Sequence, residues 1–315
     1  MEKCIEGAKR LINKQVHDNR VSLFGISFSE YHKSYYWTNE NIKGYLDKVD
    51  FEGKDNALSV LASGDHIFNL VEKGITNIDT FDTNKLTEYY ALGFKNAMIL
   101  KYSYEEFIQY MQIISSDNIS LEYLTELLLS LLPYMDKKYR VFWREIIEYN
   151  YKIQKEMGTN LNLFQMLCIN LGVIDARICY NNYLSSKENY EEFKNRLMLA
   201  NITFKEANAY RLEAEFDSTY DFVLLSNILD YFDKYFGKGW SYDCLKLYEK
   251  RISSLVKPEG IIFLHYIFDY NSFDRNANLI TDSSISQRTL KGEEVVLLPS
   301  DYDALDVGMI LKRVK

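Results

Sequence analysis

Short apolar runs alternate with helical patterns in the first third of the chain, and this alternation constrains the fold more than any other feature. The run at residues 57–62 ends at a polar turn, and a short helical pattern at residues 66–73 follows it. A second run, at residues 77–81, ends on Asp82 and is followed by another helical pattern. Strand–turn–helix–strand–helix is the βαβ arrangement, which predicts a parallel sheet.

A helical stretch interrupts this alternation between residue 103 and about residue 196, where no strand is expected. Ser103 and Glu106 form the sequence pattern of a capping box at its start. Apolar residues then recur at helical spacing over residues 121–132 and 139–157, and such stripes usually face a core. The pattern predicts helices inserted between the second and third strands of one α/β domain.

The strand pattern resumes after the insertion. Further strands are expected at residues 202–204, 220–226, 261–266, 293–298 and 307–313, the last two as a closing hairpin. The sequence therefore predicts an α/β, Rossmann-like sheet of seven strands, five alternating with helices and two at the end.

The extra length is assigned to two additions to this domain. We expect an N-terminal helical arm or lid at residues 1–50, and a Rossmann-like domain at residues 51–315 that carries the helical insertion at residues 103–196. The aromatic residues 35–37 could cover a ligand as a lid or pack in the ordinary way, and packing is the favoured alternative.

Composition limits the partners and the compartment. Lys and Arg total 37 and Asp and Glu total 45, a formal net charge of −8, so a broad nucleic-acid interface is not expected. The N-terminus lacks a signal-peptide core and no apolar run approaches roughly 18 residues. The four cysteines are scattered without a CxxC pair, which predicts reduced thiols, no metal site and a cytoplasmic protein.

Candidate ligand-binding residues follow the predicted strands, because parallel sheets bind ligands at the carboxyl ends of their strands. The first strand is followed by Ala62, Ser63, Gly64 and Asp65. This turn has one glycine and is far from GxGxxG, so a phosphate cradle is weakly supported and an ordinary tight turn remains the alternative. A ligand without a pyrophosphate fits such a turn better, which favours S-adenosylmethionine (SAM) over NAD.

The other strand ends add polar residues. Asp82 and Thr83 follow the second strand, where a carboxylate can accept hydrogen bonds from both ribose hydroxyls or cap a helix. Asn208, after the third strand, could read an adenine amino group or lie in a solvated loop. Ser226 and Asn227 follow the fourth strand and are expected in the floor of the pocket.

Catalytic candidates lie at the ends of the fourth and fifth strands. A base is useful if the acceptor is a hydroxyl or an ammonium group. The residues that could serve are Asp230, His265 and Tyr266. A lone histidine in a strand is more often a core residue with satisfied hydrogen bonds, so that alternative stays open for His265.

Three segments resemble class I SAM-dependent transferases, and more narrowly the SAM:diacylglycerol 3-amino-3-carboxypropyl transferases of betaine-lipid synthesis. They are VLASGDHIFNL at residues 60–70, FDTN at 81–84 and LSNILDY at 225–231. That family also has a long helical insertion with an aromatic pair like Phe142-Trp143, and the resemblance covers roughly residues 30–270.

The resemblance implies a SAM-transferase sheet in which different strand ends bind different parts of the cosubstrate. Gly64 and Asp65 would lie near its methionine part, Asp82 at the ribose and Asn208 near the adenine. The chain departs from the family at residues 84–85, which are Asn-Lys in place of Asn-Pro, and it has no basic patch for a membrane. The acidic charge thus counts against a lipid acceptor.

The leading hypothesis is a SAM-dependent transferase of the aminocarboxypropyl type, acting on a small-molecule or lipid acceptor and not on nucleic acid. One alternative is a small-molecule methyltransferase, in which a different carbon of the sulfonium faces the acceptor. A non-catalytic SAM-fold binding module is the alternative from another class. The sequence predicts no transmembrane segment, allows peripheral membrane contact and leaves the oligomeric state open.

Overall fold

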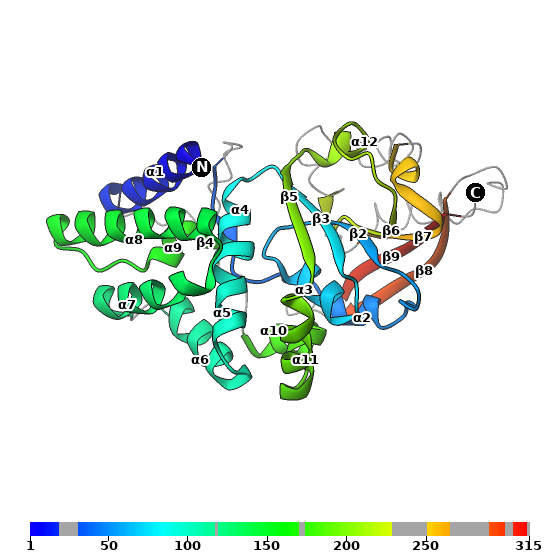
Figure 1. Ribbon diagram of the computed structural model, residues 1–315, viewed down its shortest axis with the longest axis horizontal. Coiled ribbons are helices and arrows are strands. Elements are labelled where there is room, and N and C mark those ends of the chain that lie inside the picture. The colour runs from blue at the N-terminus through cyan, green and yellow to red at the C-terminus, as the bar shows by residue number, and fades with distance from the viewer. Residues whose placement is uncertain are drawn as a thin grey trace.

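The computed structural model describes most of the chain, namely residues 1–18, 31–116, 119–169, 174–228, 251–264, 290–299 and 305–313. Figure 1 shows a helical part on one side of the molecule and a large sheet on the other. The second, two-stranded sheet consists of β1 (Ser34–Tyr35) and β4 (Cys168–Ile169).

The large sheet has seven strands within the described residues. They are β2 (Asn56–Val60), β3 (Asn77–Asp82), β5 (Asn201–Glu206), β6 (Tyr220–Leu224), β7 (Val256–Leu264), β8 (Leu290–Pro299) and β9 (Leu305–Arg313). Their order is β5-β3-β2-β6-β7-β9-β8, with parallel pairing from β5 to β7 and antiparallel pairing of β9 with both β7 and β8. The predicted Rossmann-like fold is confirmed, and its last strand, β9, is antiparallel to both neighbours.

Helices account for much of the described chain outside these strands. Those outside the insertion are α1 (Glu2–Asp18), α2 (Ile42–Leu46), α3 (Asp65–Glu72), α4 (Leu86–Glu88), the π-helix η1 (Tyr89–Lys95), α5 (Asn96–Lys101), η4 (Ala209–Arg211), α12 (Leu212–Glu215) and η5 (Ser253–Leu255). Those between residues 103 and 197 are α6 (Tyr104–Ser115), α7 (Leu121–Leu131), η2 (Leu132–Tyr134), α8 (Lys137–Met157), α9 (Leu163–Leu167), α10 (Ile174–Tyr180), η3 (Asn182–Leu184) and α11 (Lys187–Leu197).

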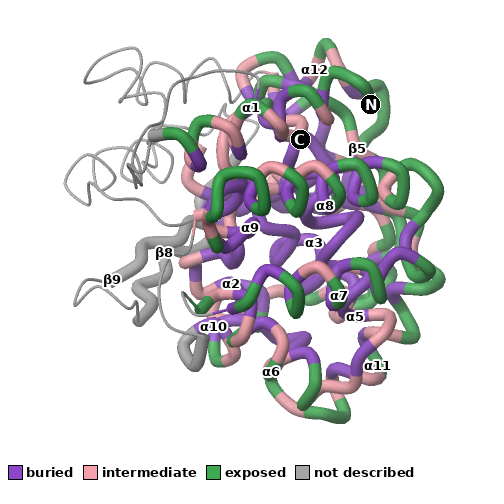
Figure 2. Tube along the Cα trace, turned by 90° about the vertical axis from the view of Figure 1, so that its left-hand side faces the viewer, coloured by how far each residue is buried: buried purple, intermediate pink, exposed green. Residues whose placement is uncertain are grey.

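Strand periodicity divides the sheet between two apolar clusters. Ala57, Phe222 and Phe263 join the larger cluster with the helices, whereas Leu58 and Val223, one residue along, join the smaller cluster on the other face. Figure 2 shows α3 buried from Asp65 to Val71, while α7 and α8 alternate between buried and exposed positions. The sheet is therefore covered on one face by α3 and the helices around it.

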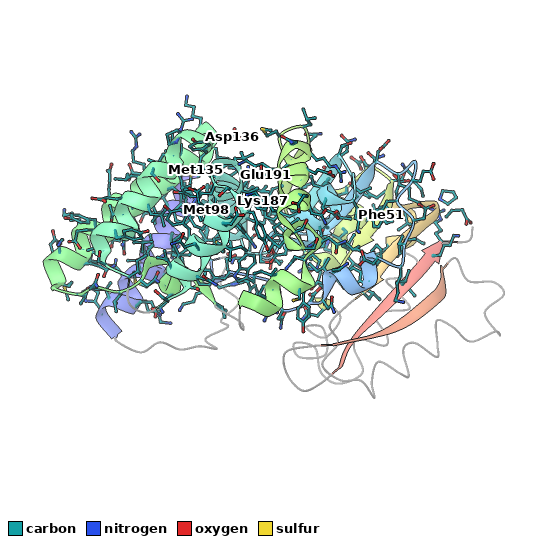
Figure 3. The ribbon with its side chains drawn as sticks, turned by 90° about the horizontal axis from the view of Figure 1, so that it is seen from below. Phe51, Met98, Met135, Asp136, Lys187 and Glu191 are labelled. Carbon is teal, nitrogen blue, oxygen red and sulfur yellow. The ribbon has the colours of Figure 1, made fainter. Side chains whose placement is uncertain are left out.

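The insertion and the N-terminal helix form one helical part. Helix α1 packs against α8 and α9, and Lys9 lies 3.7 Å from Glu145 of α8. Helix α11 packs against both α6 and α3. In Figure 3, Lys187 and Glu191 mark α11, which lies between the helices near Met98 and Met135 and the side of the sheet near Phe51. Helix α11 thus joins the helical part to the sheet.

One expectation for the insertion is wrong. Strand β4 lies within it and pairs in parallel with β1 of the N-terminal segment. Two residues are too few to produce a period of two in a sequence, so this pairing is visible only in the tertiary structure. The adjoining rings of Tyr36 and Trp37 are buried in the core, which is the packing alternative rather than the lid.

Local signals at the helix ends agree with the structure. The Ser103–Glu106 capping box is present, with both reciprocal hydrogen bonds. Gly158 ends α8 with a left-handed backbone, as Gly74 does after α3. The expected helix before residue 255 is described only from Arg251 onward.

The structure describes three of the four cysteines. Cys4 and Cys168 are buried free thiols, Cys179 is an exposed free thiol, and Cys244 lies outside the described residues. No cluster of potential metal ligands occurs among the residues that the structure describes. None of the helices described combines the length and apolar character that crossing a bilayer requires.

Gly64 follows β2 and Gly53 precedes it, and the two offer a matched test of the packing around Gly64. Both have positive φ, +86° and +69°, but a Cβ at Gly64 would lie 3.0 Å from atoms of Ala91 and Phe68, whereas one at Gly53 would meet nothing within 4 Å. Gly53→Ala should lower the free energy of unfolding by about 1–2 kcal/mol through backbone strain alone. Gly64→Ala should cost roughly 1–3 kcal/mol more because of overpacking, as measured by denaturant unfolding. Equal losses would contradict the close packing of this turn.

Candidate functional site

The carboxyl ends of β2 and β6 carry two residues with unusual backbone conformations. Ala62, after β2, has φ +42°, and Ser226, after β6, has φ +52°. Non-glycine residues rarely adopt positive φ, and strained residues of this kind gather at functional sites. The chain leaves β2 toward β3 on one side and later returns to β6 on the other, so the two residues flank the switch point where open α/β sheets bind ligands.

The turn after β2 is held closely by the protein itself. Gly64 has a left-handed backbone and its N–H donates to the carbonyl of Leu61 at 2.7 Å. The space that a Cβ would need is occupied by Ala91 and Phe68. The glycine therefore permits a tight turn against neighbouring side chains, which is the ordinary-turn alternative, whatever ligand lies beyond it.

Asp65 connects four segments at the start of α3. Its side chain is fully buried, and Oδ1 accepts hydrogen bonds from Lys95 Nζ at 2.5 Å and Tyr183 OH at 2.7 Å. Oδ2 accepts from the backbone N–H of Thr38 and from Ser63 Oγ, both at 2.7 Å. These four donors stabilise a buried carboxylate. They also engage both oxygens of the residue that was expected near the methionine part of a cosubstrate.

Lys95 is the buried cation that balances Asp65. It lies at the end of the π-helix η1, and its Nζ also contacts the carbonyl oxygens of Tyr36 at 3.2 Å and Ser63 at 3.3 Å. The ammonium lies 4.1 Å from the centroid of the Trp37 ring. Burial lowers the pKa of Lys95, and the charge of Asp65 opposes that shift.

Asp82 lies at the end of β3, beside the turn after β2. Its Oδ2 accepts from the backbone N–H of Ala62 at 3.1 Å, and its Oδ1 accepts from that of Asn84 at 2.8 Å. Burial raises the pKa of this carboxyl group, and the hydrogen bond from Asn84 opposes the rise. Each ionised carboxylate oxygen can accept more than one hydrogen bond, so Asp82 retains acceptor capacity toward a ligand.

Glu40 forms a second buried polar group across the same turn. Its Oε2 lies 2.7 Å from His66 Nε2, and its Oε1 accepts a hydrogen bond from Ser226 Oγ. Glu40 and His66 are 3% and 1% exposed. Among the described residues, His66 Nδ1 has no hydrogen-bond partner, and an unpaired buried nitrogen costs about 1–3 kcal/mol. This atom is where the described structure leaves a polar group unsatisfied at the switch point.

The remaining predicted site residues lie at the other strand ends or outside the described part of the chain. Thr83 and Asn208 are exposed, and the Asn208 side chain accepts from the N–H of Tyr210 at 2.9 Å. Asn227 Oδ1 lies 3.3 Å from Ser226 Oγ. The three predicted catalytic residues, Asp230, His265 and Tyr266, lie outside the described residues.

Sequence reasoning missed Glu40 and Lys95 as members of this site, and His66 was included only in a motif. Glu40 meets His66 across 26 positions and Ser226 across 186. No local pattern encodes contacts over such separations. Lys95 had one available signal, since a lysine between Phe94 and Ala97 interrupts the apolar face of a predicted helix.

Comparisons with known proteins give distant structural likenesses. No protein-family model and no curated protein matches the chain. The chain is similar to the rRNA methyltransferase aviRa from Streptomyces viridochromogenes, with 11% identity, a TM-score of 0.40, and 93% of this chain and 90% of that chain covered. It is also similar to an rRNA methylase from Streptococcus thermophilus, with 7% identity, a TM-score of 0.35, and 83% and 89% covered. At these values the likeness carries no inference about activity.

The buried Lys95–Asp65 pair should matter far more than an exposed pair of the same type. Lys95→Met leaves the Asp65 carboxylate buried without its cation, and we expect a loss of about 3–5 kcal/mol in the free energy of unfolding. Lys187 and Glu105, whose side chains are 57% and 60% exposed, lie 3.1 Å apart. Lys187→Met should cost less than about 1 kcal/mol. Similar losses for both variants in denaturant unfolding would show that the buried pair is not a special stabilising contact.

Proposed function

We propose that the protein is a SAM-dependent transferase. The observation that carries the proposal is the position of Asp82, an acidic side chain at the end of the strand next to β2, bonded to the turn after β2. A carboxylate at this place can hold the ribose hydroxyls of a nucleoside. The strand order and the antiparallel β9 support the same family of folds.

The residues at the switch point fit such a cosubstrate better than a dinucleotide. The turn after β2 has a single glycine, and its backbone is packed against Phe68 and Ala91, so it offers little of the cradle that a pyrophosphate needs. Asp82 would hold the ribose at the end of β3, Asn208 follows the neighbouring strand β5 for the adenine, and Ala62, Ser63 and Gly64 form the turn after β2 on the other side of Asp82. The SAM sulfonium would supply an electrophilic carbon for transfer to the acceptor.

The finer proposal is transfer of the 3-amino-3-carboxypropyl group, and it rests on the resemblance of the strand-end segments at residues 60–70 and 225–231. Methyl transfer uses the same cosubstrate with another carbon facing the acceptor. In either case the acceptor forms a bond to carbon, the carbon–sulfur bond breaks, and the acceptor loses a proton. The protein contributes chiefly by aligning the two reactants.

Two measurements test this proposal. Isothermal titration calorimetry should detect binding of SAM and of 5′-methylthioadenosine, which shares its nucleoside. Incubation with SAM and candidate acceptors should then yield a nucleoside product that identifies the transferred group. Methylthioadenosine indicates aminocarboxypropyl transfer, and S-adenosylhomocysteine indicates methyl transfer. Absence of binding by SAM and both products would refute the proposal.

Asp82→Asn tests the ribose contact directly. Loss of a charge-assisted pair of hydrogen bonds should weaken SAM, S-adenosylhomocysteine and methylthioadenosine alike, by about 10- to 100-fold in Kd. Glu122→Gln, which removes one exposed carboxylate on α7, is the matched control and should change none of the three affinities. Unchanged binding in Asp82→Asn would place the ribose elsewhere.

A further inference from the structure

The strongest unexplained feature of the molecule is the buried group of Glu40, His66 and Ser226. Glu40 belongs to the N-terminal segment, His66 to α3 and Ser226 to the loop after β6. Burial of a carboxylate is costly unless donors surround it. Here the Ser226 hydroxyl and the His66 imidazole each contact one oxygen of Glu40. Burial is the main cause of the raised pKa of the Tyr45 phenol, and the charge of nearby Glu40 raises it further.

The N-terminal segment is fixed across the ends of the strands by independent contacts. Strand β1 pairs with β4, the carbonyl of Tyr36 accepts from Tyr90 OH at 3.0 Å, and the N–H of Thr38 donates to Asp65. Asn41 then caps α2. Glu40 is therefore delivered to the switch point by a firmly held segment.

Asp82 and Glu40 lie on opposite sides of the turn after β2. Asp82 bonds to Ala62 from the β3 side, whereas Glu40 bonds to Ser226 at the end of β6. With β2 between β3 and β6 and adjacent strands about 4.8 Å apart, the two strand ends are separated by about 10 Å. A SAM molecule whose nucleoside is held by Asp82 would thus extend its sulfur-linked amino-acid chain toward Glu40.

We propose that Glu40, held by His66 and Ser226, binds the ammonium group of the amino-acid part of SAM. The inference rests on the proposed function, and it assigns Glu40 to the amino-acid end of SAM, opposite to the ribose end at Asp82. An ammonium group is a three-fold donor that suits a carboxylate already oriented by neighbours. The switch-point site is then completed by the N-terminal segment as well as by the sheet.

The unsatisfied His66 Nδ1 supports this assignment independently. With Glu40 ionised, His66 Nε2 must carry a hydrogen to bond with it, which leaves Nδ1 to be satisfied by something beyond the described residues. An α-amino acid offers a donor in its ammonium group and an acceptor in its carboxylate. It can therefore satisfy Nδ1 whether that nitrogen accepts or donates a hydrogen bond.

The test compares ligands that differ only in the amino-acid part. S-adenosylhomocysteine carries it, and methylthioadenosine lacks it while keeping the nucleoside. Calorimetry on Glu40→Gln should show S-adenosylhomocysteine and SAM weakened by about 10- to 100-fold in Kd, with methylthioadenosine changed by less than about twofold. Asp82→Asn serves as the contrasting variant because it should weaken all three ligands.

The outcomes separate the inference from the function beneath it. If wild-type protein binds none of the three ligands, the proposed function fails. If it binds them and Glu40→Gln weakens all three equally or none, the assignment of Glu40 is overturned. Should Glu40→Gln not fold, Ser226→Ala removes one hydrogen bond to Glu40 and should show the same selectivity in smaller degree. An equal effect of Ser226→Ala on S-adenosylhomocysteine and methylthioadenosine would also overturn the assignment.

Discussion

The buried ion pair between Asp65 and Lys95 holds the rest of the site in place. Asp65 starts α3, Lys95 ends the π-helix, and the carboxylate also receives Thr38 from the N-terminal segment and Tyr183 from the insertion. Four parts of the chain far apart in sequence thus converge on one side chain. Removing a partner from such a pair is costly because the remaining charge stays buried. The pair therefore couples the position of the turn after β2 to the helical part.

The helical insertion and the N-terminal segment are joined to the same turn through this ion pair. The insertion supplies Tyr183 to Asp65 and β4 to β1. The segment that follows β1 supplies Glu40 to the ends of β2 and β6. A sheet alone would present Asp82 and a tight turn, which form the nucleoside part of the proposed site. The added elements build the other half of the proposed site.

Two kinds of polar group surround the switch point, and they differ in what they can do for a ligand. Asp65 accepts two hydrogen bonds on each oxygen, one of them from the buried Lys95, so its role is to hold segments together. Asp82 and Glu40 are bonded to the protein as well, but they lie on either side of the turn between β3 and β6. Strain at Ala62 and Ser226 is concentrated there too. In the proposed site, ligand binding is therefore assigned to Asp82 and Glu40, on either side of the turn after β2, and not to Asp65.

The sequence by itself determined the βαβ beginning, the long helical insertion, the closing hairpin and the acid at the end of the second strand. These features depend on local periodicity, on caps such as Ser103 with Glu106, and on turn residues, all of which act over a few positions. It also placed Ala62, Gly64 and Ser226 at strand ends, because alternation of strands and helices fixes where each strand stops.

Only the tertiary structure decided which of those residues meet and which further residues join them. The pairing of β1 with β4, the bond of Lys95 to Asp65 and the contact of Glu40 with Ser226 each connect distant segments. Such contacts form because burial forces polar side chains to find partners wherever the packed chain brings them. A local pattern cannot specify those partners, since they depend on how whole elements pack together.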